Sequence, residues 1–470
     1  MDISAYSLLA IFSPLLLTLF LLIKRIRLSY INKKVLNNAL IFVNSISLIL
    51  FSALGFFILK DNLEISKEFA FISIEKLTIN LGIILNQENI IMLVFASFIY
   101  FLISLYSKKY FNKKKQFLFT KQRYYSFLSV LIFNTYIFIT SPNLLQSVVF
   151  WIVQGVTIYL FGFFDIFKHT TNYNITRFFR IDLIGNFAFL VSILILYKYS
   201  LVANEYVASN SLGYETFKQL TNYMFGICNY SEFIVCLCGF LVAIVCKLTI
   251  FPFSCYYSFF ANSSNIYYLS IPTTNIIFGT YLFSQILHFE EFVKEYIFGF
   301  EIFIGITIIT SLFILLFEKN IKIIFGYLYS IINASFLICF LYFNKTWILY
   351  IYLGVILFVL SLLMLIFYKD KTNLSRRLIN KQKGFFLERQ HIVVFEVLPV
   401  KIFAIINFID EKILNNIKKL SISLLDTVFS MFVIKSVSKK KINIAKNLLI
   451  IILFFIVISI LLTIFWRGKC

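Results

Sequence analysis

The chain has 470 residues, of which 60% are hydrophobic and only 14% are charged. Soluble domains are close to half apolar and a quarter charged, so this composition excludes a soluble globular protein. The formal net charge of +21 invites a nucleic-acid-binding interpretation, but Lys and Arg gather at the ends of apolar runs, where basic residues set membrane topology and meet anionic lipids. We therefore expect a membrane protein that contacts lipids and has no nucleic-acid partner.

Apolar runs of roughly 20 residues recur along the chain, and this length crosses a hydrocarbon core of ~30 Å as an α-helix. They predict an all-α, polytopic membrane helix bundle of about twelve transmembrane helices. The expected spans cover residues 6–23, 39–59, 90–106, 125–140, 144–164, 181–199, 233–253, 267–287, 296–317, 323–342, 347–367 and 448–466. The first run is too long for the apolar part of a signal peptide, so we interpret it as the first span.

The loops between the expected spans alternate in charge. Basic loops follow the first, third, fifth and eleventh spans, and loops such as 205–232 and 290–295 are neutral or acidic. Such alternation is what the positive-inside rule predicts for a correct order of spans. We therefore expect the N-terminus to lie outside and the basic loops to face the matrix or the cytoplasm.

The segment between the eleventh and twelfth spans has a different pattern. From 406 to 428 its apolar residues recur at steps of three and four, and charged or amide residues fill the other faces. This charge density forbids a span and predicts an amphipathic lateral helix on the basic side. An interfacial helix facing lipid and a strap across neighbouring subunits are both open. The expected parts are N-terminal spans (1–120), an antiporter-like repeat (121–290), a truncated second repeat (291–370), the lateral helix (385–445) and a C-terminal anchor (446–470).

Lys247 is the most informative ionisable residue, because charged groups at membrane depth are costly and usually functional. It lies within the seventh expected span and shortly before Pro252. Proline removes a backbone donor, which gives the broken-helix geometry found beside ion paths. Burial disfavours the charged form of a lysine, which suits a group that exchanges protons. The alternative interpretation is a lysine that extends from a helix end to the membrane surface.

Three further positions are candidates. Asp182, near the start of the sixth expected span, is either the acidic partner of a buried base or a first-turn carboxylate favoured by the helix dipole. Lys322 follows Glu318 by four residues, a spacing that favours a surface ion pair. Pro272 predicts a second broken helix, and pairs of such helices point to a midplane site in transporters.

Nothing in the sequence predicts a metal site or a cofactor. The seven cysteines lie mostly inside apolar runs and show no repeated C-x-x-C spacing, and there are only three histidines. No segment resembles a flavin, nucleotide or iron–sulfur motif. We interpret the cysteines as buried structural thiols.

A series of short segments resembles, in the same order along the chain, the motifs of one protein family. They are Pro14 with Leu15, LISLYSKKYF at 102–111, the spacing of Trp151, Gly155, Tyr159 and Gly162, RFFRIDLIGNFAFL at 177–190, KLTIFPF at 247–253, FGTYL at 278–282, EKNIKIIFGYLYS at 318–330, and LP followed by FIDEKILNNI within 398–417. On these motifs the chain resembles subunit 5 of NADH:ubiquinone oxidoreductase (respiratory complex I; subunit L in bacteria), a relative of multi-subunit cation/proton antiporters. Their order, with a lateral helix before a last span, carries the resemblance.

The resemblance implies a membrane-arm subunit of a proton-pumping NADH:ubiquinone reductase, with no redox site in this chain. It places Lys247 on the family's central lysine and makes Lys247, Asp182, Lys322 and Glu232 the proton-path candidates. The implied partners are the antiporter-like subunits 4 and 2. The implied location is the mitochondrial inner membrane or, alternatively, a bacterial inner membrane; a bias toward Ile, Phe, Tyr, Asn and Lys suggests an AT-rich genome of an organelle or a reduced bacterium.

The sequence also departs from the family. Ile152 stands where the family has an acidic residue, so the usual lysine–glutamate pair is broken unless Asp182 or Glu232 replaces it. A histidine of the family's eighth span is lost near Ile271, and twelve spans are expected where the family has sixteen. We therefore expect at most a partial proton path, or a mainly structural role in the distal arm. A cation/proton antiporter subunit and a non-transporting polytopic scaffold are the alternative functions.

Overall fold

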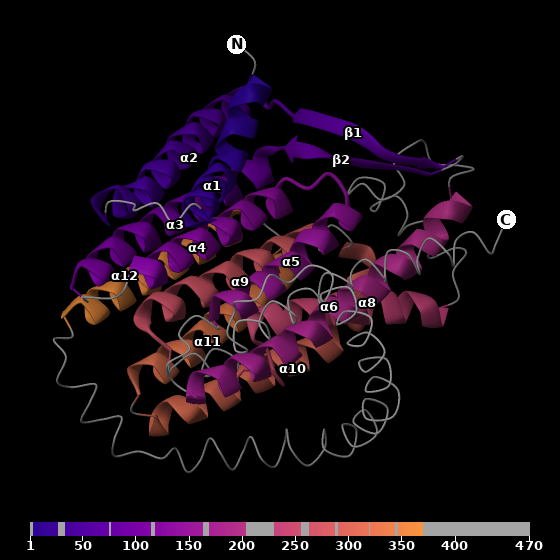
Figure 1. Ribbon diagram of the computed structural model, residues 1–470. Coiled ribbons are helices and arrows are strands. Elements are labelled where there is room, and N and C mark those ends of the chain that lie inside the picture. The colour runs from indigo at the N-terminus through magenta and orange to yellow at the C-terminus, as the bar shows by residue number, and fades with distance from the viewer. Residues whose placement is uncertain are drawn as a thin grey trace, which may run out of the picture. The chain divides into compact units, whose positions relative to one another are not determined.

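The structure is a computed structural model that describes residues 3–26, 33–74, 77–113, 118–162, 169–203, 230–254, 263–286, 290–318, 320–343 and 346–369 (Figure 1). Over these residues the chain forms helices and one two-stranded sheet. The helices are α1 (Ile3–Ile26), α2 (Lys33–Asp61), α3 (Gln87–Lys113), α4 (Leu118–Ile139), α5 (Leu144–Gly162), α6 (His169–Ala203), α8 (Tyr230–Leu248), α9 (Asn265–Ile286), α10 (Glu290–Phe317), α11 (Ile321–Phe343) and α12 (Thr346–Lys369), and the strands are β1 (Ile65–Ile74) and β2 (Leu77–Leu85).

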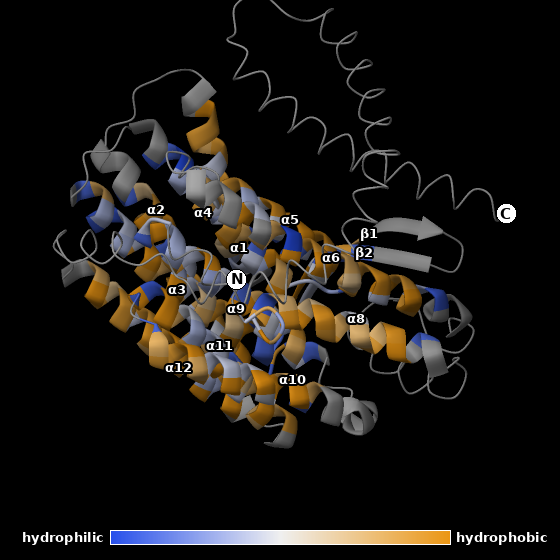
Figure 2. Ribbon diagram, turned by 90° about the horizontal axis from the view of Figure 1, so that it is seen from below, coloured by the Kyte–Doolittle hydropathy of each residue, from blue (hydrophilic) through white to orange (hydrophobic). Residues whose placement is uncertain are grey.

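The predicted helix bundle is confirmed, because each of the first eleven expected spans overlaps one of these helices. Eight of the described helices are long and apolar enough to cross a membrane by themselves: α1, α2, α3, α5, α6, α10, α11 and α12. Hydrophobic residues cover most of the helical surface (Figure 2). The protein is therefore an integral membrane protein.

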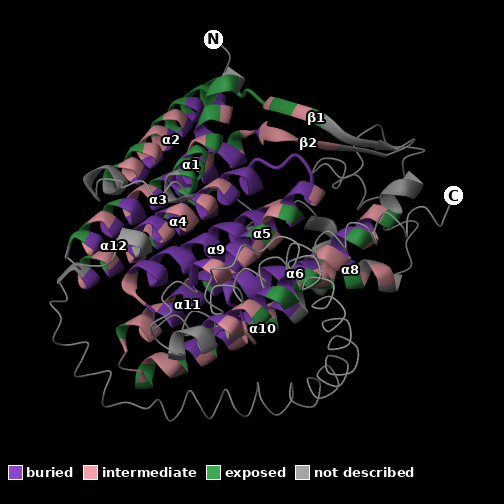
Figure 3. Cartoon of the chain, viewed as in Figure 1, coloured by how far each residue is buried: buried purple, intermediate pink, exposed green. Residues whose placement is uncertain are grey.

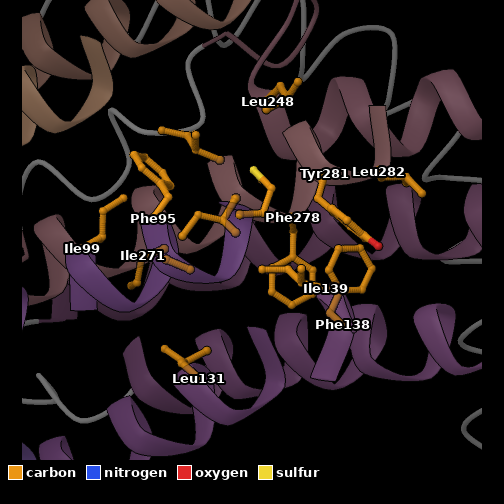
Figure 4. Close-up of a cluster of buried hydrophobic side chains, with 14 of the residues drawn as sticks. Phe95, Ile99, Leu131, Phe138, Ile139, Leu248, Ile271, Phe278, Tyr281 and Leu282 are labelled. Atoms are coloured by element: carbon orange, nitrogen blue, oxygen red, sulfur yellow. The ribbon is translucent and has the colours of Figure 1, made fainter. Parts of the chain in front are cut away.

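The bundle has a buried centre and an apolar periphery. In α3, 67% of the spanning window is buried inside the protein, against 22% in α10 (Figure 3). Phe138 of α4 stacks on Phe278 of α9 at 4.2 Å between ring centroids, and Tyr281 packs edge-on against Phe138 (Figure 4). Helix α9 thus lies among α3, α4, α5 and α8, two of which, α5 and α8, also contribute to the site described below.

The hairpin of β1 and β2 was not predicted from the sequence. Its strands pair antiparallel, and the side-chain amide of Gln146 in α5 holds β2 by donating to the Gly82 carbonyl and accepting from the Gly82 N–H, both at 3.0 Å. The Ile84 N–H also donates to the Thr140 carbonyl at 2.9 Å. An open sheet edge is not tolerated in contact with lipid hydrocarbon, so we expect the free edges of the hairpin to avoid the lipid.

The expected lateral helix (385–445) and the twelfth span (448–466) lie outside the described residues, and both stay predictions. The number of spans and the division of the chain into parts stay predictions for the same reason.

Candidate functional site

Helix α8 ends at Leu248, directly after Lys247, rather than at residue 253 as the hydropathy pattern predicts. Thr249 has a positive φ of 59°, and the following residues leave the helix. The Phe251 N–H donates to the Thr307 hydroxyl of α10 at 2.7 Å, which satisfies one of the backbone groups that the break exposes. Irregular backbone at membrane depth is tolerated where protein surrounds it in this way.

Two further helices hold the broken end of α8. The Asn333 side chain of α11 donates to the Leu248 carbonyl at 2.8 Å, and the Tyr352 hydroxyl of α12 donates to the Asn333 oxygen at 2.8 Å. The Thr249 hydroxyl lies 2.9 Å from that of Ser330 in α11. Lys247 is therefore carried on a helix end whose position is fixed by three neighbouring helices.

Lys247 forms a buried ion pair with Asp182. Its Nζ lies 2.5 Å from Asp182 Oδ1, and each side chain is only 1% exposed. The same Nζ donates to Gln154 Oε1 at 2.5 Å and lies 5.0 Å from the centroid of the Trp151 ring. Buried charges require this kind of partner, because an unpaired charge in a low-dielectric interior is strongly disfavoured.

Neutral amides extend this pair on both sides. Gln154 Nε2 donates to Asn275 Oδ1 at 2.6 Å, and Asn186 Nδ2 donates to Asp182 Oδ2 at 3.2 Å. Gln154 and Asn275 are fully buried and Asn186 almost so. We call Lys247, Asp182, Gln154, Asn275 and Asn186 the Lys247 cluster, to which α5, α6, α8 and α9 each contribute.

Gly155 of α5 makes room for the carboxylate of the cluster. A Cβ at this position would lie 1.9 Å from Asp182 Oδ2, well inside van der Waals contact. Gly279 of α9 likewise faces the end of α8, where a Cβ would meet the Leu248 side chain at 2.7 Å. Asp182 and Lys247 therefore meet at positions where the neighbouring helices carry no side chain.

The structure resolves the two interpretations of Asp182. Helix α6 begins at His169 rather than near residue 181, so Asp182 lies in the middle of the helix, far from the positive end of its dipole. The first-turn interpretation is therefore wrong, and Asp182 lies against Lys247 as the alternative expected. The reason for the error is that the first turns of α6 carry polar residues, which hydropathy alone excludes from a span.

The other candidates lie elsewhere. Glu232 pairs with Lys198 at 2.8 Å, where the two side chains are 32% and 61% exposed. Lys322 Nζ donates to the Ser263 carbonyl at 2.6 Å and lies 5.7 Å from the centroid of the Tyr268 ring, outside the Lys247 cluster.

The expected break at Pro272 is not present, because α9 is helical throughout Asn265–Ile286. Hydroxyls near this proline bond to carbonyls one turn back, as Thr273 does to Leu269 at 2.9 Å and Thr274 to Ser270 at 2.7 Å. Polar side chains of this kind help a transmembrane helix to tolerate proline.

Sequence reasoning missed Gln154 and Asn275. Both are amides inside otherwise apolar spans, and a polar side chain at membrane depth is the signal that identified Lys247. The same signal therefore extends to amides as well as to ionisable residues and prolines.

No family profile matches the chain. It is 25% identical over 293 residues to the NADH-quinone oxidoreductase subunit L of Buchnera aphidicola subsp. Baizongia pistaciae, an alignment that covers 61% of this chain and 45% of the relative. It is 26% identical over 128 residues to the chloroplastic NAD(P)H-quinone oxidoreductase subunit 5 of Zygnema circumcarinatum, covering 27% of this chain and 18% of the relative. The chain thus spans less than half the length of these relatives.

Two solved respiratory complexes contain chains with a similar fold. One is the archaeal membrane-bound sulfane sulfur reductase, with a TM-score of 0.56 and 14% identity, and the other is respiratory complex I from Thermus thermophilus, with a TM-score of 0.55 and 12% identity. Each match covers 70% of this chain and 63% of the other. These similarities confirm the resemblance to subunits L and 5, in divergent and partial form, and the antiporter-like helix-bundle fold.

Proposed function

We propose that this chain, a divergent relative of subunits L and 5, is a membrane-arm subunit of a proton-pumping NADH:quinone oxidoreductase. In this proposal the Lys247–Asp182 pair is the centre of a partial proton path. The observation that carries it is a base and an acid 2.5 Å apart, both 1% exposed, at a helix end inside an apolar bundle. Ionisable groups that are not needed for function are rarely kept at such a place.

The pair is suited to proton transfer because the protonation state of each group affects proton binding by the other. With Asp182 ionised and Lys247 protonated, the pair carries no net charge. A proton that binds to Asp182 removes the charge that stabilises the buried ammonium, so Lys247 then holds its own proton less firmly. Neutralising one group thus promotes release from the other, which is the coupling that a proton relay needs. The driving force would come from redox chemistry in other subunits of the complex.

The proposed partners are the antiporter-like subunits 4 and 2 and the surrounding lipids. The proposed location is the mitochondrial inner membrane, with a bacterial inner membrane as the alternative; the compositional bias of the sequence is compatible with both. Lys322 is proposed as a second, more peripheral proton-path residue because its ammonium is bound by a backbone carbonyl near the helix ends. Glu232 is proposed to act at the membrane surface with Lys198, at a distance from the central pair.

Membership of the complex is tested by extraction of native membranes in mild detergent followed by native gel electrophoresis. We expect the chain to co-migrate with NADH dehydrogenase activity in a large particle. Recovery of the intact chain only in a small particle would contradict the proposal and favour an antiporter subunit or a scaffold.

The proton path is tested with the variant Lys247→Ala in sealed membrane vesicles. We expect a lower rate of NADH-driven proton translocation, followed with a pH-sensitive dye, at an almost unchanged rate of NADH oxidation. Lys60→Ala is the matched control, because it removes an exposed lysine in the last turn of α2. Normal translocation by Lys247→Ala would leave only a structural role for the subunit.

A further inference from the structure

The Gln154 side chain can bind Lys247 in only one orientation. An amide presents an acceptor oxygen on one side and a donor nitrogen on the other, and its neighbours decide which way it points. Gln154 Nε2 donates to Asn275 Oδ1 at 2.6 Å, so Oε1 faces Lys247 and accepts from Nζ at 2.5 Å. In the reversed orientation the amide nitrogen would meet the lysine ammonium, and two donors would face each other.

We propose that Gln154, oriented by Asn275, is a positioning residue that keeps Lys247 in place whenever Asp182 gives up its charge. The inference rests on the proposed proton path and identifies the residue that positions its central lysine. In the ionised state Lys247 donates to a carboxylate from α6 and to an amide from α5. When Asp182 is protonated, Gln154 is the acceptor whose strength does not change, because an amide does not titrate.

Burial makes this second acceptor necessary. Lys247 is 1% exposed, so its ammonium makes almost no contact with bulk solvent when the carboxylate is neutralised. A charged donor without a partner in such a place is disfavoured far more than one that keeps a single good hydrogen bond. Without Gln154 the lysine side chain would leave the cluster, and the distance between it and Asp182 would no longer suit proton exchange.

A neutral group serves here better than a second acid. Two carboxylates beside one lysine would give the cluster a net negative charge and hold the lysine proton too firmly. Gln154 and Asn275 are each 0% exposed and come from α5 and α9, so the amide pair also joins the two helices that flank Lys247.

The first test removes the amide in the assembled complex. Gln154→Leu is expected to lower proton translocation about tenfold or more, as the loss of one hydrogen bond to a charged group implies. Asn275→Leu removes the neutral amide bond that orients Gln154 and is expected to lower translocation by a smaller factor. NADH oxidation and the amount of assembled complex serve as readouts of an intact complex. Gln146→Leu is the matched control, because it removes another buried amide of α5 whose partner is the Gly82 backbone. Normal translocation by Gln154→Leu would overturn the inference.

The second test separates positioning from mere support of the fold. Asp182→Asn is expected to abolish most translocation. The double variant Asp182→Asn/Gln154→Glu is expected to restore a substantial part, because it puts a carboxylate where the Gln154 oxygen lies, 2.5 Å from Lys247. Asp182→Asn/Gln146→Glu, which adds the same charge to the same helix away from Lys247, is expected to restore none. A residue that only supports the fold would give no rescue.

The two proposals fail in different ways. If Asp182→Asn translocates protons at the normal rate, the proposed proton path is wrong. If Asp182→Asn is impaired but Gln154→Glu does not rescue it, the path stands and the positioning role of Gln154 is wrong. Should Gln154→Leu not assemble, the double variant alone decides.

Discussion

The substitution Gly155→Ala tests the close approach of α5 to Asp182. Its Cβ would lie 1.9 Å from Asp182 Oδ2, and even the tightest contacts of real Cβ atoms stay above 3.0 Å, so the carboxylate must move by more than 1 Å. Asp182 Oδ1 is 2.5 Å from Lys247 Nζ, and a movement of this size away from α5 breaks that contact or distorts it.

The size of the effect follows from two opposing contributions. Alanine in place of glycine inside a helix stabilises it by about 0.5–1 kcal/mol. Breaking a buried ion pair costs about 3–5 kcal/mol, because one charge stays buried without its partner. The ion pair dominates, so we expect Gly155→Ala to destabilise the subunit by about 2–4 kcal/mol and to lower proton translocation as Asp182→Asn does.

The control is Gly305→Ala in α10, where a Cβ would meet nothing within 4 Å. It is expected to be neutral or slightly stabilising. The assay is the rate of thermal inactivation of the detergent-extracted complex, combined with dye-detected translocation in vesicles. If Gly155→Ala and Gly305→Ala behave alike in both measurements, the reasoning from the close approach is refuted.

Three further substitutions test other contacts. Gly82→Ala is expected to disrupt the hairpin, because its Cβ would lie 2.2 Å from the Lys67 carbonyl oxygen. Limited proteolysis between residues 65 and 85 should become faster, and unchanged cleavage would count against the strand pairing. Tyr352→Phe removes the hydrogen bond to Asn333 and should cost about 1 kcal/mol, seen as faster thermal inactivation with the α8 end loosened. Gly239→Ala should force α6 and α8 apart, because its Cβ would lie 2.7 Å from a backbone oxygen of α6. We expect slower proton translocation at unchanged NADH oxidation. An unaffected translocation rate would show that the two helices need not pack so closely.

Hydropathy predicted most of the bundle, because a helix in lipid needs an apolar surface over its whole length. The same argument fails where the surroundings are protein. The polar first turns of α6 are helical although they are too polar for a span, and α8 stops at Leu248 although apolar residues continue. The hairpin was missed because its strands lie in a stretch that was considered only as a loop between two spans, although 65–74 is rich in the aromatic and β-branched residues that favour strands.

The candidate site was half predictable. Lys247 stood out because a lysine inside an apolar run calls for a functional explanation. The sequence left the role of Asp182 open and did not point to Gln154, because these residues are 65 and 93 positions away from Lys247 along the chain. Pairing over such separations depends on how α5, α6 and α8 pack, and no local pattern in one sequence records this.

The helix that supplies the carboxylate partner of Lys247 differs from the one that the resemblance implies. By resemblance the carboxylate belongs at position 152 of α5, which is Ile152 in this chain. A buried lysine needs an acceptor, but any helix that reaches it can supply one. Here α6 supplies Asp182, and it fits because Gly155 leaves α5 open at that point.

Gln154 is next to Gly155 in α5. It is two residues from position 152 and therefore about 200° around the helix from it. An acid restored at 152 would therefore point away from the amide that binds Lys247, whereas one at 154 would meet the lysine directly. The lysine is thus paired with a carboxylate on α6, where the resemblance implies one on α5.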